Sequence, residues 1–412
     1  MNAVHPMNRH IPVLDGLRGL AIIAVIVCHV NWSLGGPLIP GRVNGPLAMV
    51  FGWGWVGVDL FFVLSGFLIT GILHDTKGCD RYFRNFYARR MLRILPLYFG
   101  FLVFAMFALP RLPCKFCTEG VVSNADALSL GLYFYNVRLA FTGHTLSFFH
   151  PFWSLAIEEH FYLLWPWVVW ALRRCALMRL CLVVAASSCL LRMIVLLSEA
   201  WPLSAFFLTP CRLDGLLAGS FVALAWRDPA DWAHIQRYAR QLVLGAGFLL
   251  LGIALGQRHF LPNVTPQQVG HEAAVNGTLV LTVGIAALTM FFAGVIALTV
   301  DATEGSRLQR VLESPSLRAI GKYSYAIYVF HSLILLATAS LLSPLGYVPA
   351  FIAKPVALLW VLSVSFVAAW LSFHLYEKHF LLLKRFFEYR HPTYADAPVP
   401  SQHQLYIQGK HL

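Results

Sequence analysis

Ten apolar segments, each close to the roughly 20 residues that a helix needs to cross a bilayer, constrain this chain more than any other feature. Hydrophobic residues make up 58% of its 412 residues and charged residues only 12%, against roughly 25% charged residues in ordinary globular proteins. Because a helix satisfies its own backbone hydrogen bonds in lipid, the pattern predicts an all-α polytopic membrane protein. The predicted spans are about 13–31, 54–73, 94–110, 152–172, 177–198, 207–226, 241–256, 276–299, 320–342 and 355–376.

The distribution of Lys and Arg predicts that both termini are cytoplasmic. With this orientation the inner segments carry 22 Lys and Arg, as positive-inside topology requires. The outer segments carry six, namely Arg42, Arg111, Lys115, Arg138, Arg258 and Lys354. The net charge of +12 therefore reports topology, and no nucleic-acid partner is expected. No apolar segment is followed by a small-residue cleavage site, so we expect the first span to stay in the mature protein.

The chain is expected to consist of one membrane part over 1–378 and a cytoplasmic tail over 379–412. The tail is polar and rich in proline, so it is expected to be partly disordered. The longest outer segment contains an apolar stretch that would invert every later loop if it crossed the membrane. We therefore expect a re-entrant or interfacial segment near 127–149. Cys114 and Cys117 share this outer loop and could form a small disulfide, whereas no metal site is predicted.

Arg18 and His29 stand in one apolar run of the first span. Eleven helical residues turn through about three full turns, so both side chains leave one face, roughly 16 Å apart along the axis. Asp15 precedes Arg18 by three residues and can pair with it. An ionisable group within the bilayer is costly and therefore indicates a functional site. The alternative for His29 is a neutral imidazole bonded to a neighbouring helix.

Other polar residues fall into two zones under this topology. An inner zone contains Arg18 and a basic loop over 84–93. An outer zone, at about the depth of His29, contains Asp59, Glu158, Glu159, Arg212 and Asp214. The polar face of the first span is expected to join the two zones into a polar path.

Each of these residues also has a purely structural interpretation. The basic loop could determine topology and bind anionic lipid. Trp153 and Tyr162 could belong to an interfacial aromatic belt. Arg212 and Asp214 could neutralise one another. It is the number of ionisable groups at two matched depths that favours a function.

Two functions suit such an arrangement. The first is transfer of an acyl group from a cytosolic thioester to a hydroxyl near the outer leaflet. Arginines would bind the phosphates of a coenzyme A donor, His29 would act as base, and Arg212 or a backbone amide would stabilise the oxyanion. The second is a proton-coupled transporter that uses His29, Glu158 and Asp214 as a relay. Against the transporter, the sequence lacks clear pairs of helices interrupted by Gly or Pro.

The sequence resembles the type three family of integral membrane acyltransferases, which O-acylate cell-surface and exported carbohydrates. The resemblance covers about 11–378 and is carried by five motifs in order. These are Leu14-Asp15-Gly16-Leu17-Arg18-Gly19-Leu20-Ala21 with His29; Asp59-Leu60-Phe61-Phe62-Val63-Leu64-Ser65-Gly66-Phe67; Arg90-Met91-Leu92-Arg93-Ile94-Leu95-Pro96; Trp153-Ser154-Leu155 with Glu158, Phe161 and Tyr162; and Tyr325-Ala326-Ile327-Tyr328 with His331.

The resemblance implies a bacterial inner-membrane enzyme that uses acetyl-CoA or another short acyl-CoA as co-substrate, with no tightly bound cofactor. His29 would be the catalytic histidine and Arg18 its partner on the donor path, with Glu158 near the acceptor. Arg90 and Arg93, with the adjacent Arg89, would bind the donor. Supporting polar groups would be Asp15, Asp59, Ser65, Trp153, Ser154, Tyr162, Arg212, Asp214, Tyr325 and His331.

Three points stay open after this comparison with the family. His160 stands where the family usually has Gln. Some members carry a fused extracytoplasmic hydrolase-like domain, which is not expected within these 412 residues. His29 could act as a general base or carry the acyl group covalently. The acyl chain, the acceptor sugar and the oligomeric state are not predicted.

Overall fold

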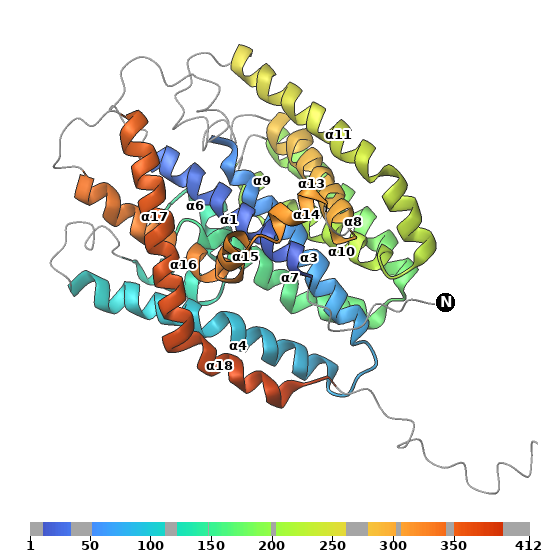
Figure 1. The fold of residues 1–412 in the computed structure, drawn as a ribbon, viewed down its shortest axis with the longest axis horizontal. Helices are drawn as coiled ribbons and strands as arrows, with labels where there is room; N and C mark the ends of the chain where they lie inside the picture. Colours follow the sequence, from blue (N-terminus) through green and yellow to red (C-terminus); the bar gives the residue numbers. More distant parts are fainter. Residues whose placement is uncertain are drawn as a thin grey trace, which may run out of the picture.

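The computed structural model describes residues 11–33, 52–111, 122–146, 148–198, 203–260, 279–301, 306–342 and 350–389. All regular elements in these ranges are helices, as predicted (Figure 1). Eight of them are long and apolar enough to cross a membrane. Their bounds are Pro12–Asn31, Trp53–Asp75, Tyr82–Arg111, Arg174–Leu197, Pro229–Gly256, Val280–Val300, Ser324–Leu341 and Lys354–Phe387.

These candidate spans are built from named helices. They are α1 (Pro12–Ser33), η1 with α3 (Trp53–Trp55, Val56–Asp75), α4 with η2 and η3 (Tyr82–Val103, Phe104–Ala108, Leu109–Arg111), α8 (Arg174–Leu197), α11 (Pro229–Phe260), η6 with α13 (Val280–Gly284, Ile285–Val300), α16 (Ser324–Leu342), and α17 with η8, α18 and η9 (Ala350–Ser372, Phe373–Glu377, Lys378–Leu382, Leu383–Phe387).

Two of the ten predicted spans are helices that fall outside this set of eight. The predicted fourth span is α7 (Phe152–Ala171), which has 20 residues and carries both glutamates. The predicted sixth span is α10 (Leu213–Ala225), which has only 13 residues. At about 1.5 Å per residue α10 is shorter than a bilayer core. It is nevertheless almost wholly buried, so packing against other helices rather than lipid explains its apolar sequence.

The helices α3 and α10 form the most closely packed part of the core. A Cβ on Gly66 of α3 would lie 1.8 Å from the carbonyl oxygen of Leu216. A Cβ on Gly219 of α10 would lie 1.9 Å from the carbonyl oxygen of Val63. The two backbones therefore touch at these glycines, as small residues allow between membrane helices. In contrast, α11 lies along the edge of the molecule and is mostly unburied (Figure 1).

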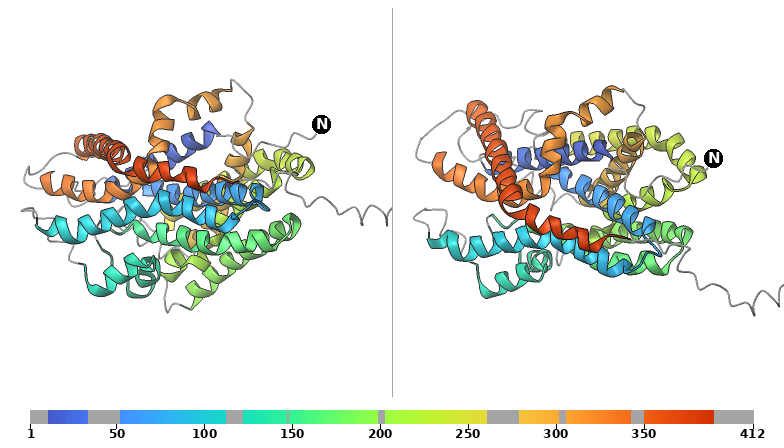
Figure 2. Two further views of the ribbon diagram at one scale, coloured as in Figure 1. Left: turned by 90° about the horizontal axis from the view of Figure 1, so that it is seen from below. Right: turned by 60° about the horizontal axis from the view of Figure 1, so that its bottom comes forward.

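The basic segment over 84–93 is helical and not a loop, which corrects the prediction. Helix α4 begins at Tyr82, twelve residues before the predicted span at 94. Its N-terminal half lies beside the C-terminal helical run, which continues past 378 through Phe387 (Figure 2). The side-chain amide of Asn85 donates to the Glu388 carbonyl oxygen at 2.9 Å. The boundary predicted at 378 thus falls inside a helical run, because its later residues pack on α4.

The outer segment predicted near 127–149 does not span. It contains α5 (Asn124–Gly131) and α6 (Tyr135–Thr142), each of eight residues and thus far too short to cross a bilayer. Helix α6 packs on α7 and on the short α9 (Ser204–Phe207). Within this segment Arg138 forms an ion pair with Asp126. The cysteines Cys114 and Cys117 and most of the predicted tail lie outside the described residues.

Two further short helices cover the N-terminal end of α1. Helices α14 (Arg307–Leu312) and α15 (Pro315–Lys322) precede α16. A Cβ on Gly321 would lie 1.8 Å from the Asp15 carbonyl oxygen, so α15 contacts α1 through its backbone. This contact brings the basic residues of α15 beside the first turns of α1.

Candidate active site

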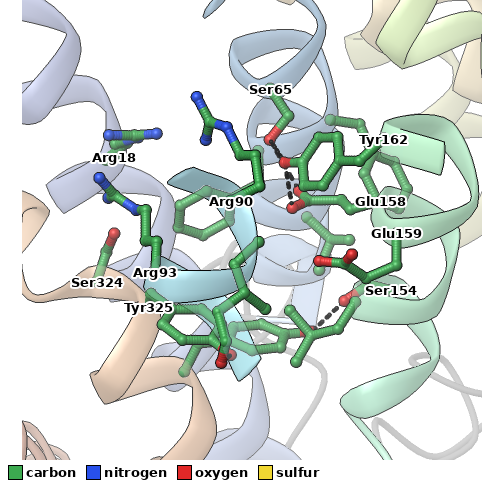
Figure 3. A pocket seen from close by; sticks show the side chains of 16 residues that line it. Arg18, Ser65, Arg90, Arg93, Ser154, Glu158, Glu159, Tyr162, Ser324 and Tyr325 are labelled. Carbon is green, nitrogen blue, oxygen red and sulfur yellow. Dashed lines mark hydrogen bonds between the residues drawn. The ribbon is translucent and has the colours of Figure 1, made fainter. Parts of the chain in front are cut away.

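Two adjoining cavities lie between α1, α3, α4, α7, α15, α16 and η8. We call the first the central cavity; it measures about 90 Å³ (Figure 3). Its lining includes Arg18, Ser65, Arg90, Arg93, Ser154, Glu158, Glu159, Tyr162, Ser324 and Tyr325. We call the second the vestibule; it measures about 580 Å³ and its lining includes Asp15, Arg18, Arg93, Arg318, Lys322, Tyr325 and Glu377. Arg18, Arg93 and Tyr325 line both, so the two cavities meet at these side chains.

Glu158 is held at the centre by two hydroxyl groups. Its Oε1 accepts a hydrogen bond from Ser65 Oγ at 2.9 Å, and its Oε2 accepts one from the Tyr162 hydroxyl at 2.9 Å. Tyr162 also donates to Ser65 Oγ at 3.2 Å. Tyr162 follows Glu158 by one turn of α7, so both side chains leave the same face. The carboxylate is therefore fixed in one orientation while it faces the cavity (Figure 3).

The side chains of the three arginines predicted to bind the donor do not all lie in one place. Arg90 and Arg93 are three residues apart on α4 and line the central cavity, Arg90 with its guanidinium 5.9 Å from the Tyr162 ring. Arg89 points elsewhere, because adjacent helical residues are turned about 100° from one another. Its guanidinium donates to the carbonyl oxygens of Lys384 and Phe387, both at 3.3 Å. Arg89 therefore holds the C-terminal helical run and does not line either cavity.

Glu158 and Glu159 lie with the arginines, which corrects the prediction that they belong to an outer zone with His29. The reason is the position of Ser65, the hydrogen-bond partner of Glu158, on α3. Ser65 is six residues further along α3 than Asp59, or about 9 Å at 1.5 Å per residue. Asp59 and Glu158, which were predicted at one depth, are thus separated along the axis of α3.

The buried charges of the outer zone form two separate ion pairs. Arg212 pairs with Asp59 at 2.7 Å, and Arg192 pairs with Asp214 at 2.7 Å. The suggestion that Arg212 and Asp214 neutralise one another is wrong, because each is paired with a residue of another helix. Arg192 was missed as a site residue. It stands inside a predicted apolar span, and this unfavourable position is the signal that could have found it.

Aromatic residues surround Arg212. The rings of Phe62, Trp153 and Phe206 have their centroids 5.0–6.0 Å from its guanidinium carbon. Trp153 is only 5% exposed and Tyr162 only 6%. Both side chains are therefore buried among helices, and the interpretation as an interfacial belt is wrong for each.

His29 contacts a second histidine. Its Nδ1 lies 3.1 Å from His331 Nε2, although 302 positions separate the two residues. His331 is fully buried, whereas His29 is partly exposed. His331 Nδ1 lies 2.7 Å from the carbonyl oxygen of Tyr328. The two imidazoles thus form a chain that begins on α16 and ends on α1.

Tyr328 stands between this histidine pair and the central cavity. Its ring lines the cavity together with Phe61 and lies 5.4 Å from the His331 ring. Its hydroxyl is held by Ser154 Oγ at 2.6 Å and by the Pro151 carbonyl oxygen at 2.9 Å. Among the described residues, the lining of the two cavities includes Arg18 but not His29. The continuous polar face predicted along α1 is interrupted, since Ile22 and Ile26 are fully buried between the two.

Several residues of the vestibule were not predicted. Arg318 and Lys322 are on α15 and Glu377 is on η8, elements whose position beside α1 follows from tertiary packing. Tyr325 was predicted and lines both cavities, and its hydroxyl donates to the Ile94 carbonyl oxygen at 3.0 Å. His160, the departure from the family motif, bonds through Nδ1 to Thr209 Oγ1 at 2.7 Å. It is not part of either cavity lining.

These observations define a class: an all-helical membrane protein with arginine-lined cavities, a fixed and partly buried carboxylate and a histidine pair. The chain belongs to the acyltransferase 3 family, whose profile is described as an acyltransferase domain and matches residues 11–375. The resemblance found in the motifs is thereby confirmed.

Curated relatives carry related names. The chain is 28% identical over 390 residues to "Peptidoglycan O-acetyltransferase OatA" of Listeria monocytogenes, covering 90% of this chain and 56% of the relative. It is 34% identical over 235 residues to "Putative peptidoglycan O-acetyltransferase YrhL" of Bacillus subtilis, covering 53% and 34%. It is 27% identical over 343 residues to "O-acetyltransferase OatA" of Staphylococcus aureus, covering 78% and 50%. The chain spans about half the length of these relatives or less. No solved structure matches it.

Proposed function

We propose that this chain is a membrane O-acyltransferase that moves an acyl group, in the simplest case acetyl, from cytosolic acyl-CoA to a hydroxyl of an exported carbohydrate. The observation that carries the proposal is the pair of adjoining cavities, which leads from a cationic vestibule to the carboxylate of Glu158. The family and the names of the relatives support acyl transfer to a carbohydrate.

The vestibule suits the phosphate groups of the donor. Arg18, Arg93, Arg318 and Lys322 place four cationic side chains around about 580 Å³. This is within the range of small-molecule sites. Arginine binds phosphate through a planar fork of donors, and a lysine adds a point charge. The pantetheine arm would enter the central cavity between Arg18 and Arg93, which places the thioester near Glu158.

The proposed chemistry uses His29 as the base. His29 Nε2 takes the proton from the acceptor hydroxyl, and the hydroxyl oxygen attacks the thioester carbonyl carbon. The carbon–sulfur bond then breaks, and the coenzyme thiolate receives the proton. The reacting atoms must come within about 3.5 Å of one another. Because Tyr328 lines the cavity and its ring contacts that of His331, we expect this ring to move aside during transfer.

Glycan mass spectrometry tests the proposal. A deletion strain is complemented with the wild type or with His29→Ala, and its surface and exported glycans are compared. We expect a mass increment of about 42 Da, that of one acetyl group, only with the wild type. Purified protein in liposomes should also release free thiol from acetyl-CoA when the acceptor is present. Unchanged glycan masses together with altered solute uptake would support the transporter instead.

A further inference from the structure

The buried His331 was grouped with the supporting polar groups, but its hydrogen bonds give it a more specific part. A carbonyl oxygen can only accept a hydrogen bond, so the Tyr328 carbonyl requires that His331 carries its proton on Nδ1. The other nitrogen of a neutral imidazole is then an acceptor. His331 Nε2 is the atom that faces His29, at 3.1 Å.

The same reasoning extends to His29. Because His331 Nε2 accepts, His29 Nδ1 must donate, so the proton of His29 is on Nδ1 and its lone pair is on Nε2. Ser332 Oγ lies 3.2 Å from the same His331 nitrogen and, as a hydroxyl, can supply a second donor to it. The contact from α16, beginning at a backbone carbonyl, therefore favours the Nδ1–H tautomer of His29.

We propose that His331 is a positioning residue that keeps His29 in the Nδ1–H tautomer, with Nε2 left to take the proton of the acceptor hydroxyl. The inference rests on the proposed function, in which His29 is the base. It adds a residue on another helix that favours reaction at Nε2 of His29.

The surroundings of His331 suit this part. His331 is fully buried, and the preceding turn of α16 is tied to α7 through the Tyr328 hydroxyl, which bonds to Ser154 and to the Pro151 carbonyl. The accepting nitrogen is thus held by two helices. When His29 takes a proton, its Nδ1–H bond to His331 becomes charge-assisted and stronger. His331 therefore orients the base and stabilises its protonated form, as the third member of a catalytic triad does with an imidazole.

A matched pair of substitutions separates hydrogen bonding from packing. In His331→Gln the amide oxygen can still accept from His29 Nδ1, whereas His331→Met has a side chain of similar length and no comparable acceptor. We expect His331→Met to lower kcat for acyl transfer by about 10²-fold, the lower range for a general base, with an unchanged KM for acetyl-CoA. We expect His331→Gln to stay within about tenfold of the wild type. His29→Gln, with no base, serves as the reference.

The outcomes are distinct. If His331→Met matches the wild type while His29→Gln is inactive, the positioning role is wrong and the proposed function stands. Equal losses in His331→Met and His331→Gln would also overturn the role, because restoring an acceptor would then restore nothing. An active His29→Gln would instead remove the proposed base, and with it the function on which the inference rests.

A spectroscopic measurement on the unaltered chain keeps the inference testable if His331→Met does not fold. The protein contains 16 histidines, so ¹⁵N-histidine solid-state spectra of wild type and His29→Gln are subtracted to isolate His29. We expect the His29 signals of a neutral ring protonated on Nδ1. Signals of a ring protonated on Nε2 would overturn the inference.

Discussion

Two groups of charged residues in this membrane protein are built in opposite ways: one is buried, and the other lines the cavities and is partly or fully exposed. Asp59, Arg192, Arg212 and Asp214 form two ion pairs, each with a 2.7 Å contact. Around the cavities, Arg18, Arg90 and Arg93 form no ion pair within 4 Å with a carboxylate in the described part of the chain. Charges that are paired connect helices, whereas charges that face a cavity can bind a charged ligand.

The paired group connects three helices. Asp59 is on α3, Arg192 on α8, and Asp214 on α10, which begins directly after Arg212. All four side chains are at most 6% exposed. Separating such a pair leaves a charge without compensation, which is more costly than replacing both partners by apolar residues. Variants of the ion pairs should therefore change the free energy of unfolding, whereas variants of the cavity arginines should change donor binding.

The largest effect is expected on stability in the paired group. Asp214→Leu leaves Arg192 buried without its carboxylate and should lower the free energy of unfolding by about 3–5 kcal/mol. Denaturant unfolding in detergent micelles measures it. The control is the double variant Arg192→Leu with Asp214→Leu, which should recover most of the loss. A double variant as unstable as the single one would show that the pair does not act as an isolated unit.

Next is an effect on activity in the cavity group. Glu158→Gln keeps the shape of the side chain but removes the charge that faces the arginines, and we expect acyl transfer to fall by about 10²-fold. The melting temperature should change little, because the amide oxygen still accepts from Ser65 or Tyr162. Glu159→Gln, on the adjacent position of α7, is the matched control and should lose less activity. Equal losses of activity in Glu158→Gln and Glu159→Gln would show that Glu158 has no specific role in acyl transfer.

The sequence predicted the helices more accurately than it predicted which of their residues contact one another. Hydropathy predicted the all-helical membrane architecture, and the short non-spanning helices near 127–149 fit the topology argument. It could not show that α10 is too short to span, because a buried helix and a lipid-facing helix are equally apolar.

The candidate site was only partly predictable for a related reason. Hydrogen bonds and ion pairs join residues far apart in sequence, and spacing carries no information about them. Asp59 and Arg212 are 153 positions apart, and His29 and His331 are 302 apart. Arg90 and Arg93 could be grouped because three residues on a helix share a face. Arg89 could be separated from them only once the segment was known to be helical.

A smaller effect, on donor binding, tests whether the arginines that face the two cavities bind the acyl-CoA donor. Arg90→Ala and Arg93→Ala should each raise the KM for acetyl-CoA by about tenfold, the equivalent of one charge-assisted hydrogen bond. Arg89→Ala is the control, because its guanidinium binds carbonyl oxygens of the C-terminal helical run. It should leave this KM close to the wild-type value. The differences should shrink in high salt, since exposed charges are screened.

If all three arginine variants raised KM alike, a general positive potential at the inner face, and not the cavity, would explain donor binding. The contrast between Arg89 and its neighbours is therefore the sharpest test of the cavity group.

The smallest effect concerns an ion pair outside the membrane spans, between Asp126 of α5 and Arg138 of α6. Burial raises the pKa of Asp126, but hydrogen bonds from Ser123 and Arg138 outweigh burial and hold the pKa below its ordinary value of 3.8. A lowered pKa in the folded state stabilises the fold above about pH 4, and this contribution is lost as the pH falls further. Asp126→Asn should therefore lower the free energy of unfolding at pH 7, by about 1 kcal/mol or less.

The pH dependence of this difference checks the assignment. Unfolding of wild type and Asp126→Asn is compared from pH 7 down to about pH 3, and the two should converge at the acidic end because the wild-type carboxyl is then protonated as well. A difference that stays constant over this range would mean that the loss comes from packing and not from charge. The Asp126–Arg138 pair would then differ from both groups compared above. The partners in the buried ion pairs compensate each other's charge, and the arginines that line the cavities have a charge that can bind a ligand.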